Sequence, residues 1–374
     1  MNRPAFRGTA FRRVVVPGIA ALALGLSVTA CGAGNESGGT DDSTTGSNSL
    51  SGVLKGAGSS AQDAAMSAWR ADFQKANSGV TVNYDPAGSG AGIEQFNAGA
   101  VDFAGSDAAL DPSKGEVEAA TKRCGGDVLE VPDYVSPIAV IFNVKGVDKL
   151  DLDAATLAKI FAGKITKWND PAIAGQNKGV NLPDTTIAPV HRSDESGTTQ
   201  NFTDYLNKAS GGAWSWDADK VWPVKGGEGA NGTSGVVAAV KSGNGSIGYA
   251  DDSQAGDFTK VSVKVGSAYV APSAEGAAKA LSASPLDTSR AAGDMAVQVD
   301  RTTTADGAYP VMLTSYLIAC PTYSSDKADL VKGLLSYIVS TDGQQSAATT
   351  AGSAPLPADL QQKAAAIVDG IKAK

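Results

Sequence analysis

DVLEVPDYVSPIAVIFNV, residues 127–144, is the stretch of the chain that decides its fold. Two apolar runs of strand length are joined there by Pro-Asp-Tyr-Val-Ser-Pro. A strand path that continues through such an interruption indicates a crossing between two lobes. A second long apolar run, AYPVMLTSYLIAC, begins at Ala308 and is the candidate for a second crossing. We therefore expect hinges at 132–136 and 308–312.

Short apolar runs alternate with helical periods over most of the remaining chain. GVLKG, VTVNYD, VDFAG and GSIGYA are the expected strands. The expected helices are 59–77, 91–99, 153–162, 198–207, 233–241 and 326–340. Repeated strand–loop–helix units of this kind predict an α/β fold.

The composition is that of a globular protein rather than a disordered one. The chain has 374 residues, 42% of them hydrophobic and 19% charged, which is enough for two domains of ordinary size. The net charge is -8; without the four arginines of residues 1–30 it is -12, with 27 basic against 39 acidic side chains. A chain this acidic after residue 30 is a poor general nucleic-acid binder, because binding a phosphate backbone requires basic patches on the protein surface. It can still bind one small anion where local dipoles oppose the net field.

The first thirty residues predict a targeting segment. The basic start MNRPAFRGTAFRR leads into the apolar run VVVPGIAALALGL, which is short for a transmembrane helix. The run ends in SVTACG, a pattern similar to a bacterial lipobox, so we expect a lipoprotein signal peptide at 1–30 and a lipidated Cys31 on the outer face of the cell membrane. An ordinary signal peptide with a chance cysteine is the alternative. Residues 31–50, rich in Gly, Ser and Thr, predict a flexible tether.

Cys124 and Cys320 are the two cysteines that remain besides Cys31. In an exported protein a remaining pair favours a disulfide, and two separate buried thiols are the alternative. A metal site is not expected, because the two cysteines lie far apart and neither is next to the single histidine.

Three Gly-Ser turns share one layout at the start of an expected helix. They are GAGSSAQ (56–62), AGSGAGIEQ (87–95) and DESGTTQNF (194–202). At a helix N-terminus the first N–H groups have no partner within the helix, and the dipole end is positive. One such turn is ordinary capping, but three that meet at one point would form an anion site.

Three charged residues add to this pattern. Arg192 is a fixed positive fork for an oxyanion, and Asp194 could pair with it; alternatively the two form an ordinary surface ion pair. Asp107 follows a strand and Gly-Ser, where it either caps a helix or accepts a proton from the anion. Phosphate carries such a proton at neutral pH and sulfate does not, so Asp107 would reject sulfate.

Several of these motifs, taken in order, resemble one family. GAGSSAQ, VNYDPAGSGAGIEQF, VDFAGSDAAL, KITKWNDPAI, HRSDESGTTQNFTDYL, GSIGYA and SAPLP are similar to the phosphate-binding protein of the bacterial phosphate-specific ABC transporter. The resemblance covers nearly all of 51–360. It implies a two-lobed α/β fold of the periplasmic-binding-protein type, with lobe 1 at 51–133 plus 312–374 and lobe 2 at 134–311.

The resemblance also implies a phosphate site between the lobes. Its positions fall on Ser59, Ser60, Ala61, Ser89, Asp107, Arg192, Ser196, Gly197 and Thr198, with Asp194 in support. Some relatives have Thr-Phe in place of Ser60-Ala61 and Ser in place of Gly90. This chain therefore lacks the aromatic ring that would separate the anion from water at the position of Ala61. The implied protein is a monomer with no catalytic residue, cofactor or metal, and its partners are phosphate, a membrane permease and the membrane.

Four other functions stay open from the residues. Ser196 with His191 could form a hydrolase pair, although triad partners normally come from distant segments. GAGSSA followed by Asp85 imitates a dinucleotide site. The ligand could be another oxyanion such as sulfate or molybdate. Bound phosphate could also serve adhesion or signalling.

Overall fold

Strand β4 (Leu129–Asn143) is the element that joins the two lobes of the molecule. Up to Pro137 it pairs antiparallel with β11 (Met312–Ala319), and from Ile138 onward it pairs antiparallel with β8 (Ser246–Asp251). The predicted crossing strand is therefore confirmed. The structure is a computed structural model that describes residues 50–374; the predicted signal peptide, Cys31 and nearly all of the tether lie outside it.

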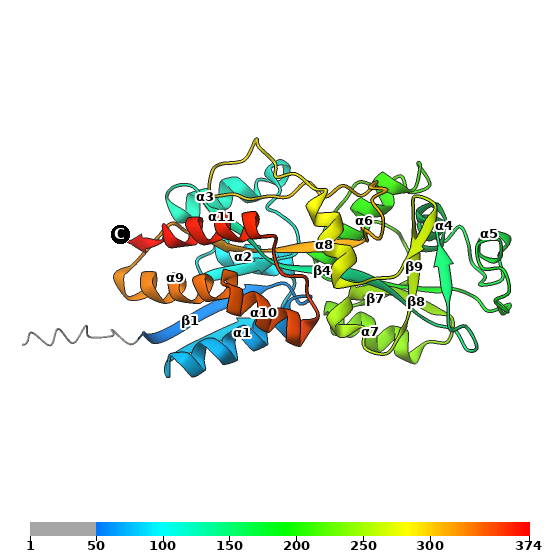
Figure 1. The fold of residues 1–374 in the computed structure, drawn as a ribbon, viewed down its shortest axis with the longest axis horizontal. Coiled ribbons are helices and arrows are strands. Elements are labelled where there is room, and N and C mark those ends of the chain that lie inside the picture. Colours follow the sequence, from blue (N-terminus) through cyan, green and yellow to red (C-terminus); the bar gives the residue numbers. More distant parts are fainter. Residues whose placement is uncertain (1–49) are drawn as a thin grey trace, which may run out of the picture. The chain divides into compact units, whose positions relative to one another are not determined.

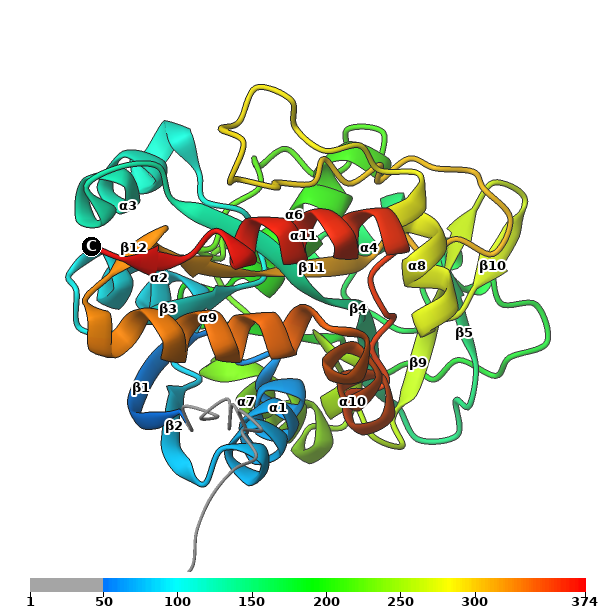
Figure 2. The same cartoon turned by 60° about the vertical axis from the view of Figure 1, so that its left-hand side comes forward.

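Lobe 1 is built on the part of the sheet with the strand order β2-β1-β3-β11-β4. Its other strands are β1 (Ser51–Gly58), β2 (Gly79–Asp85) and β3 (Phe103–Ser106). Its helices are α1 (Asp63–Ala76), α2 (Ser89–Asn97), η1 (Pro112–Lys114), α3 (Glu116–Cys124), α9 (Ser325–Val339), α10 (Thr341–Ala351) and α11 (Ala358–Asp369). A separate pair, β12 (Thr322–Tyr323) and β13 (Lys372–Ala373), ends this lobe. Figure 2 shows α9 and α11 side by side on one face of the sheet.

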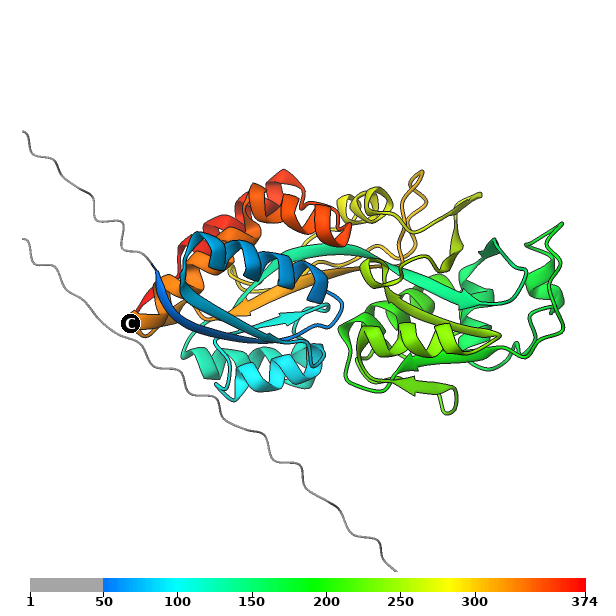
Figure 3. The ribbon, with the colours of Figure 1, turned by 90° about the horizontal axis from the view of Figure 1, so that it is seen from below.

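Lobe 2 continues the sheet with the order β4-β8-β6-β7, and β9 forms a branch that pairs with β4, β5 and β10. Its strands are β5 (Leu150–Leu152), β6 (Ala188–Arg192), β7 (Glu228–Ala230), β9 (Thr259–Val265) and β10 (Ala268–Val270). Its helices are α4 (Ala154–Phe161), α5 (Pro171–Ala174), α6 (Gly197–Ala209), α7 (Gly232–Ser242), η2 (Asp252–Gln254) and α8 (Ala274–Ser282). Figures 1 and 3 show the strands of the two lobes connected by β4.

The two crossings of the chain are hydrogen-bonded to each other. Ile138 N donates to Val311 O at 2.7 Å, and Tyr309 Oη donates to Ile138 O at 2.9 Å. β11 lies between β3 and β4, so the C-terminal crossing enters the middle of the lobe 1 sheet. Two antiparallel chain connections thus lie side by side between the lobes, as the apolar runs predict.

The predicted strands and helices are found with ends shifted by a few residues. The expected helix 59–77 is α1, because its large apolar side chains Met66, Trp69 and Phe73 all face the core. Its start is later than expected because residues 59–62 form a turn. None of the helices in residues 50–374 is both long and apolar enough to span a bilayer.

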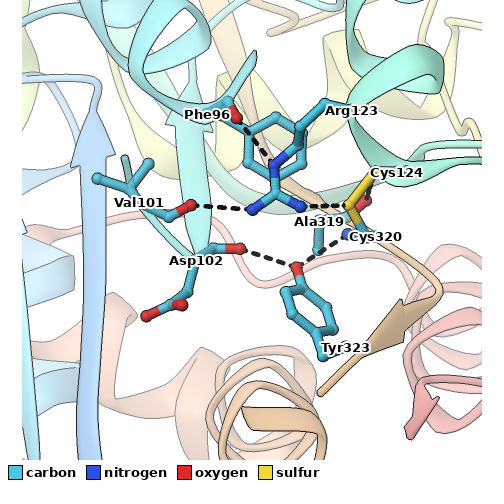
Figure 4. Close-up of a disulfide and its surroundings, with 8 residues drawn as sticks. All are labelled: Phe96, Val101, Asp102, Arg123, Cys124, Ala319, Cys320 and Tyr323. Atoms are coloured by element: carbon cyan, nitrogen blue, oxygen red, sulfur yellow. Dashed lines mark hydrogen bonds between the residues drawn. A yellow bond between two sulfur atoms is a disulfide. The ribbon is translucent and has the colours of Figure 1, made fainter. Parts of the chain in front are cut away.

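Cys124 and Cys320 form a disulfide, as the sequence predicts. It ties the end of α3 to the residue after β11, with the guanidinium of Arg123 packed beside it (Figure 4). That guanidinium lies 4.4 Å from the centre of the Phe96 ring and donates to Phe96 O at 2.8 Å and to Val101 O at 3.1 Å. The bond therefore anchors the C-terminal crossing strand to the N-terminal part of lobe 1.

Replacing both Cys124 and Cys320 by Ala should lower the free energy of unfolding by about 2–5 kcal/mol, because the disulfide restricts the unfolded chain over a long loop. Urea denaturation with and without reductant measures this. Reductant should destabilise the wild type and leave the double variant unchanged. A wild type whose denaturation curve is insensitive to reductant would contradict the prediction.

Candidate functional site

The carboxylate of Asp107 is the centre of a buried polar cluster between the lobes. Asp107 follows β3 directly, and the residue is 2% exposed. Ser59 Oγ and Ser315 Oγ, the latter at 2.8 Å, donate to Oδ1, and Thr198 Oγ1 donates to Oδ2 at 2.9 Å. A carboxylate oxygen can accept about two hydrogen bonds. Oδ1 is therefore fully used, and Oδ2 keeps one acceptor position beyond its bond from Thr198.

Glycine brings the first turn close to Asp107. Gly58 has φ of 144°, and a Cβ on it would lie 1.9 Å from Gly105 O in the adjacent strand. With that approach Ser59 N donates to Gly105 O at 2.9 Å, and the Ser59 side chain reaches Asp107. The turn that begins at Gly58 is thus shaped by close packing between β1 and β3.

The second and third turns meet across the two lobes. Ser89 Oγ, at the start of α2, accepts from Asp107 N at 3.2 Å. A Cβ on Gly197, the first residue of α6, would lie 2.7 Å from Ser89 Oγ, so only glycine fits there. Gly90 N donates to Glu195 O at 3.0 Å. The N-termini of α2 and α6 therefore face the same buried cluster.

Arg192 supplies the buried positive charge of the cluster. Its side chain is 2% exposed, and Nε donates to Asp194 Oδ1 at 2.7 Å while Nη2 donates to Oδ2. Gly232 N donates to the same Oδ1 at 3.0 Å. Burial alone would raise the pKa of Asp194, but the hydrogen bonds and charge of Arg192 hold that pKa below its ordinary value. The alternative of a surface ion pair is therefore wrong.

A fourth turn, at the start of α7, was missed by the sequence reasoning. Thr233 N donates to Ser60 Oγ at 3.1 Å, and the two hydroxyls lie 3.1 Å apart. Arg192 Nη1 donates to Thr233 Oγ1 at 3.4 Å. The signal was available, because GANGTSG at 229–235 has the same Gly and Ser/Thr layout as the other three turns.

Ser315, the third hydroxyl on Asp107, was also missed. It lies inside β11 in the run MLTSYLIA, and all eight residues of that strand are buried. The pair of polar residues Thr314-Ser315 in a largely apolar strand was the only signal. The function of Ser315 depends on β11 lying next to β3, which the sequence does not reveal.

The serines of the turns also cap helices. Ser196 Oγ accepts from Thr199 N at 3.2 Å, which is ordinary N-capping of α6, and its hydroxyl proton stays available to donate. Ser59 Oγ accepts from Ala61 N at 3.0 Å and donates to Asp107, so its hydrogen bonds are used within the protein. Asp107 itself accepts from hydroxyls rather than from the N–H groups of a helix end, so it is not a helix cap.

The ring of His191 packs against Trp222. The two rings stack with their centres 5.0 Å apart and an angle of 8° between the planes, and Nδ1 of His191 lies 2.9 Å from Arg192 O. Within residues 50–374 no hydrogen bond joins His191 to Ser196. In the same range no group of three or more His, Cys, Asp or Glu side chains could hold a metal ion.

Ion pairs between the lobes lie next to the cluster. Lys220, with a side chain 3% exposed, pairs with Glu116 of α3 at 2.8 Å, and its backbone O accepts from Ser196 N at 3.0 Å. Lys114 pairs with Asp219 at 2.7 Å. These contacts hold the lobes together around a site whose polar side chains are nearly inaccessible to solvent.

The protonation of Asp107 is shifted by this environment. Burial raises its pKa above the ordinary 3.8, against the lowering effect of its three hydroxyl donors and of Arg192. The carboxylate is thus buried, but it is surrounded by donors that favour its charged form. A partner that carries a proton can donate it to the acceptor position left on Oδ2.

Comparison with known proteins gives one consistent family. Residues 40–342 match the PBP superfamily domain. The chain is 36% identical over 368 residues to the phosphate-binding protein PstS2 of Mycobacterium bovis, which covers 94% of this chain and 97% of that protein. It is 37% identical over 373 residues to phosphate-binding protein PstS3 of the same organism, with the same coverage.

The fold is also similar to that of solved phosphate-binding proteins. A high-affinity periplasmic phosphate-binding protein bound with phosphate has a TM-score of 0.70 to this structure. It shares 22% of its sequence with this chain and covers 84% of this chain and 93% of its own. At this identity the similarity concerns the fold.

Asp107 and Asp194 should give opposite pH dependences of stability. The raised pKa of Asp107 contributes stability that is fully present below pH 3.8 and is lost as the pH rises through the folded-state pKa, so the wild type should lose stability relative to Asp107→Asn. The lowered pKa of Asp194 contributes stability that is present above pH 3.8 and is lost as the pH falls through the folded-state pKa. In acid, the free energy of unfolding of the wild type should therefore fall relative to that of Asp194→Asn.

Urea midpoints of the three proteins without added anion, from about pH 3 to 8, measure both slopes. Each variant is the control for the other, because both remove a carboxylate from the same cluster while the two pKa shifts have opposite directions. Equal slopes for the two variants would contradict the prediction.

Proposed function

The chain belongs to the PBP superfamily and to the family of PstS phosphate-binding proteins, and from this we propose that it binds inorganic phosphate between its two lobes and delivers it to the permease of a phosphate ABC transporter. The observation that carries the proposal is the buried carboxylate of Asp107, with one acceptor position left on Oδ2, beside the buried guanidinium of Arg192. A protonated oxyanion is the ligand that satisfies both groups.

The donors proposed for phosphate are those expected from the sequence. Arg192 supplies formal positive charge, and the N-terminus of α6 supplies N–H groups at Gly197 and Thr198. The other groups proposed around the anion are the hydroxyls of Ser60, Ser89 and Ser196 and the N–H group of Ala61, whereas the hydroxyl of Thr198 donates to Asp107. Ser59 acts through Asp107, to which it donates. We add Thr233, which lies between Ser60 and Arg192.

Asp107 is proposed to recognise the protonated oxygen of phosphate by accepting a hydrogen bond from it. Its Oδ2 accepts that hydrogen bond, so a fully deprotonated anion such as sulfate would place a second negative oxygen against a buried carboxylate. An uncompensated buried charge costs more than the 1–3 kcal/mol of an unpaired neutral group, on the order of several kcal/mol. One carboxylate thereby selects among anions of similar size and shape.

Closure of the lobes is proposed to bury the anion and create the surface that the permease receives. We place lobe 1 at 51–133 plus 312–374 and lobe 2 at 134–311, with hinges at 132–136 and 308–312. The change of pairing partner in β4 after Pro137, and the start of β11 at Met312, support hinges near these positions.

The chain is proposed to act as a binding protein rather than an enzyme, and as a monomer. Its relatives are named for binding, and in residues 50–374 His191 stacks on Trp222 and makes no hydrogen bond to Ser196, which a hydrolase pair would require. Export and lipidation at Cys31, which would hold the protein at the outer face of the membrane, are proposed from the residues before the described part of the chain.

Calorimetry with three anions tests the proposed function. Phosphate should bind, arsenate should compete because it too carries a proton, and sulfate should not compete. Asp107→Asn should narrow the affinity gap between phosphate and sulfate by about tenfold or more, because the amide does not repel a deprotonated oxygen. Phosphate that fails to bind the wild type would refute the function; an unchanged gap would refute only the role of Asp107.

Thr233→Val should weaken phosphate binding by about tenfold, since it removes the hydroxyl between Ser60 and Arg192 while keeping the shape of the side chain. Thr203→Val is the matched control, because Thr203 is equally buried and its hydroxyl donates to backbone carbonyls within α6 and accepts from Asp219 N at 3.3 Å, all within lobe 2. Titration calorimetry compares the two. Equal losses in both variants would show that the effect comes from general packing.

A further inference from the structure

Arg301 is a buried arginine outside the proposed phosphate site. It lies in the segment between α8 and β11, and its side chain is 2% exposed. Nη1 donates to two carbonyls of the C-terminal crossing, Pro310 O at 2.9 Å and Met312 O at 2.7 Å. Nε donates to Asp204 Oδ2 of α6 at 2.9 Å. One guanidinium thus joins the crossing strand to the helix whose N-terminus faces the anion site.

The remaining contact of Arg301 fixes the orientation of Asn201. Nη2 of Arg301 donates to Asn201 Oδ1. Because arginine has donors and no acceptor, only the oxygen of the Asn201 amide can face it. The amide nitrogen must then point the other way, where it donates to Asp107 O at 2.6 Å and to Gly197 O at 3.0 Å.

The bond from Asn201 to Asp107 joins the two lobes. Asn201 belongs to α6 of lobe 2 and is 8% exposed, whereas Asp107 follows β3 of lobe 1. The bond therefore exists only while the lobes are together. It reaches the backbone of Asp107, the residue whose side chain also receives Thr198 from the same helix.

We propose that Arg301 and Asn201 are positioning residues that couple the C-terminal crossing to closure of the lobes around the ligand. Arg301 orients the side-chain amide of Asn201 so that the NH2 group points toward Asp107. Asn201 then stabilises the closed form by donating to the backbone oxygen of Asp107. Neither residue belongs to the anion-binding set. The inference rests on the proposed function for the identity of the ligand, phosphate.

The expected effect of Asn201→Ala is a faster release of phosphate. The variant loses a bond made only in the closed form, so the dissociation rate should rise about tenfold with little change in the association rate. Stopped-flow dissociation into an excess of a phosphate scavenger measures this. Asn201→Asp, which keeps the size of the side chain and its contact with Arg301 but removes the donor, should act in the same direction and serves if the alanine variant does not fold.

Asn207→Ala is the matched control. Asn207 lies on the same helix and its amide also donates to a backbone carbonyl, Trp216 O at 2.9 Å, but that bond stays within lobe 2. A structural role alone would lower the thermal stability of the ligand-free protein in both variants. The proposal expects only Asn201→Ala to lose part of the stabilisation that phosphate confers, while equal release rates in wild type and Asn201→Ala would overturn it.

A double-mutant cycle tests whether Arg301 acts through Asn201. Arg301→Lys keeps the charge but loses the fork that contacts both Asn201 and the crossing strand. In the wild-type background it should speed phosphate release several-fold, and in the Asn201→Ala background it should add less than twofold. Fully additive effects would overturn the coupling.

Small-angle scattering separates this inference from the proposed function. If the wild type binds no phosphate, the function fails, yet Asn201→Ala should still give a larger radius of gyration than the wild type and Asn207→Ala, because the ligand-free lobes have lost a closing contact. Identical scattering profiles for all three proteins would overturn the inference, whatever the ligand.

Discussion

A charged carboxylate is costly to remove from water unless hydrogen-bond donors surround it, and Asp107 receives such donors from both lobes. Its donors come from three distant parts of the chain, Ser59 after β1, Thr198 on α6 and Ser315 in β11. Two of them belong to lobe 1 and one to lobe 2. Asp107 therefore accepts all three of these hydrogen bonds only when the lobes are together, so the group proposed to select the ligand also responds to closure.

The net charge of the protein opposes the binding of an anion, and the local structure overcomes this opposition. The chain carries -8 overall, but four helix or turn N-termini and Arg192 face the cluster. Asp194 partly neutralises Arg192 and holds its guanidinium in place. Fixed dipoles need no counter-charge and no rearrangement, which suits a site that must release its ligand.

Much of the fold could be predicted because it depends on local patterns. The crossing at β4 follows from two apolar runs joined by a segment with a proline at each end, and the start of each helix at the site follows from Gly next to Ser or Thr. The convergence of the turns was not predictable from residues alone, because it depends on strand order. β11 lies between β3 and β4, and nothing local to MLTSYLIA specifies that place.

The same limit explains which site residues were missed. Thr233 repeats a recognisable turn and could have been found, whereas Ser315 and Asn201 act through neighbours far away in the sequence. Arg301 lies in a segment without regular structure, where no periodicity indicates burial. Residues whose function is set by long-range contacts require the folded structure to be recognised.

The position of β11 has a consequence for how the protein is assembled. A chain that emerges amino end first makes β3 and β4 long before the strand that must fit between them. Lobe 2, whose strands from Ile138 to Val270 follow one another, can complete its sheet while lobe 1 still has a gap. Lobe 1 is thus begun first and finished last, and its unfinished edges need protection from other chains until Met312–Ala319 arrives.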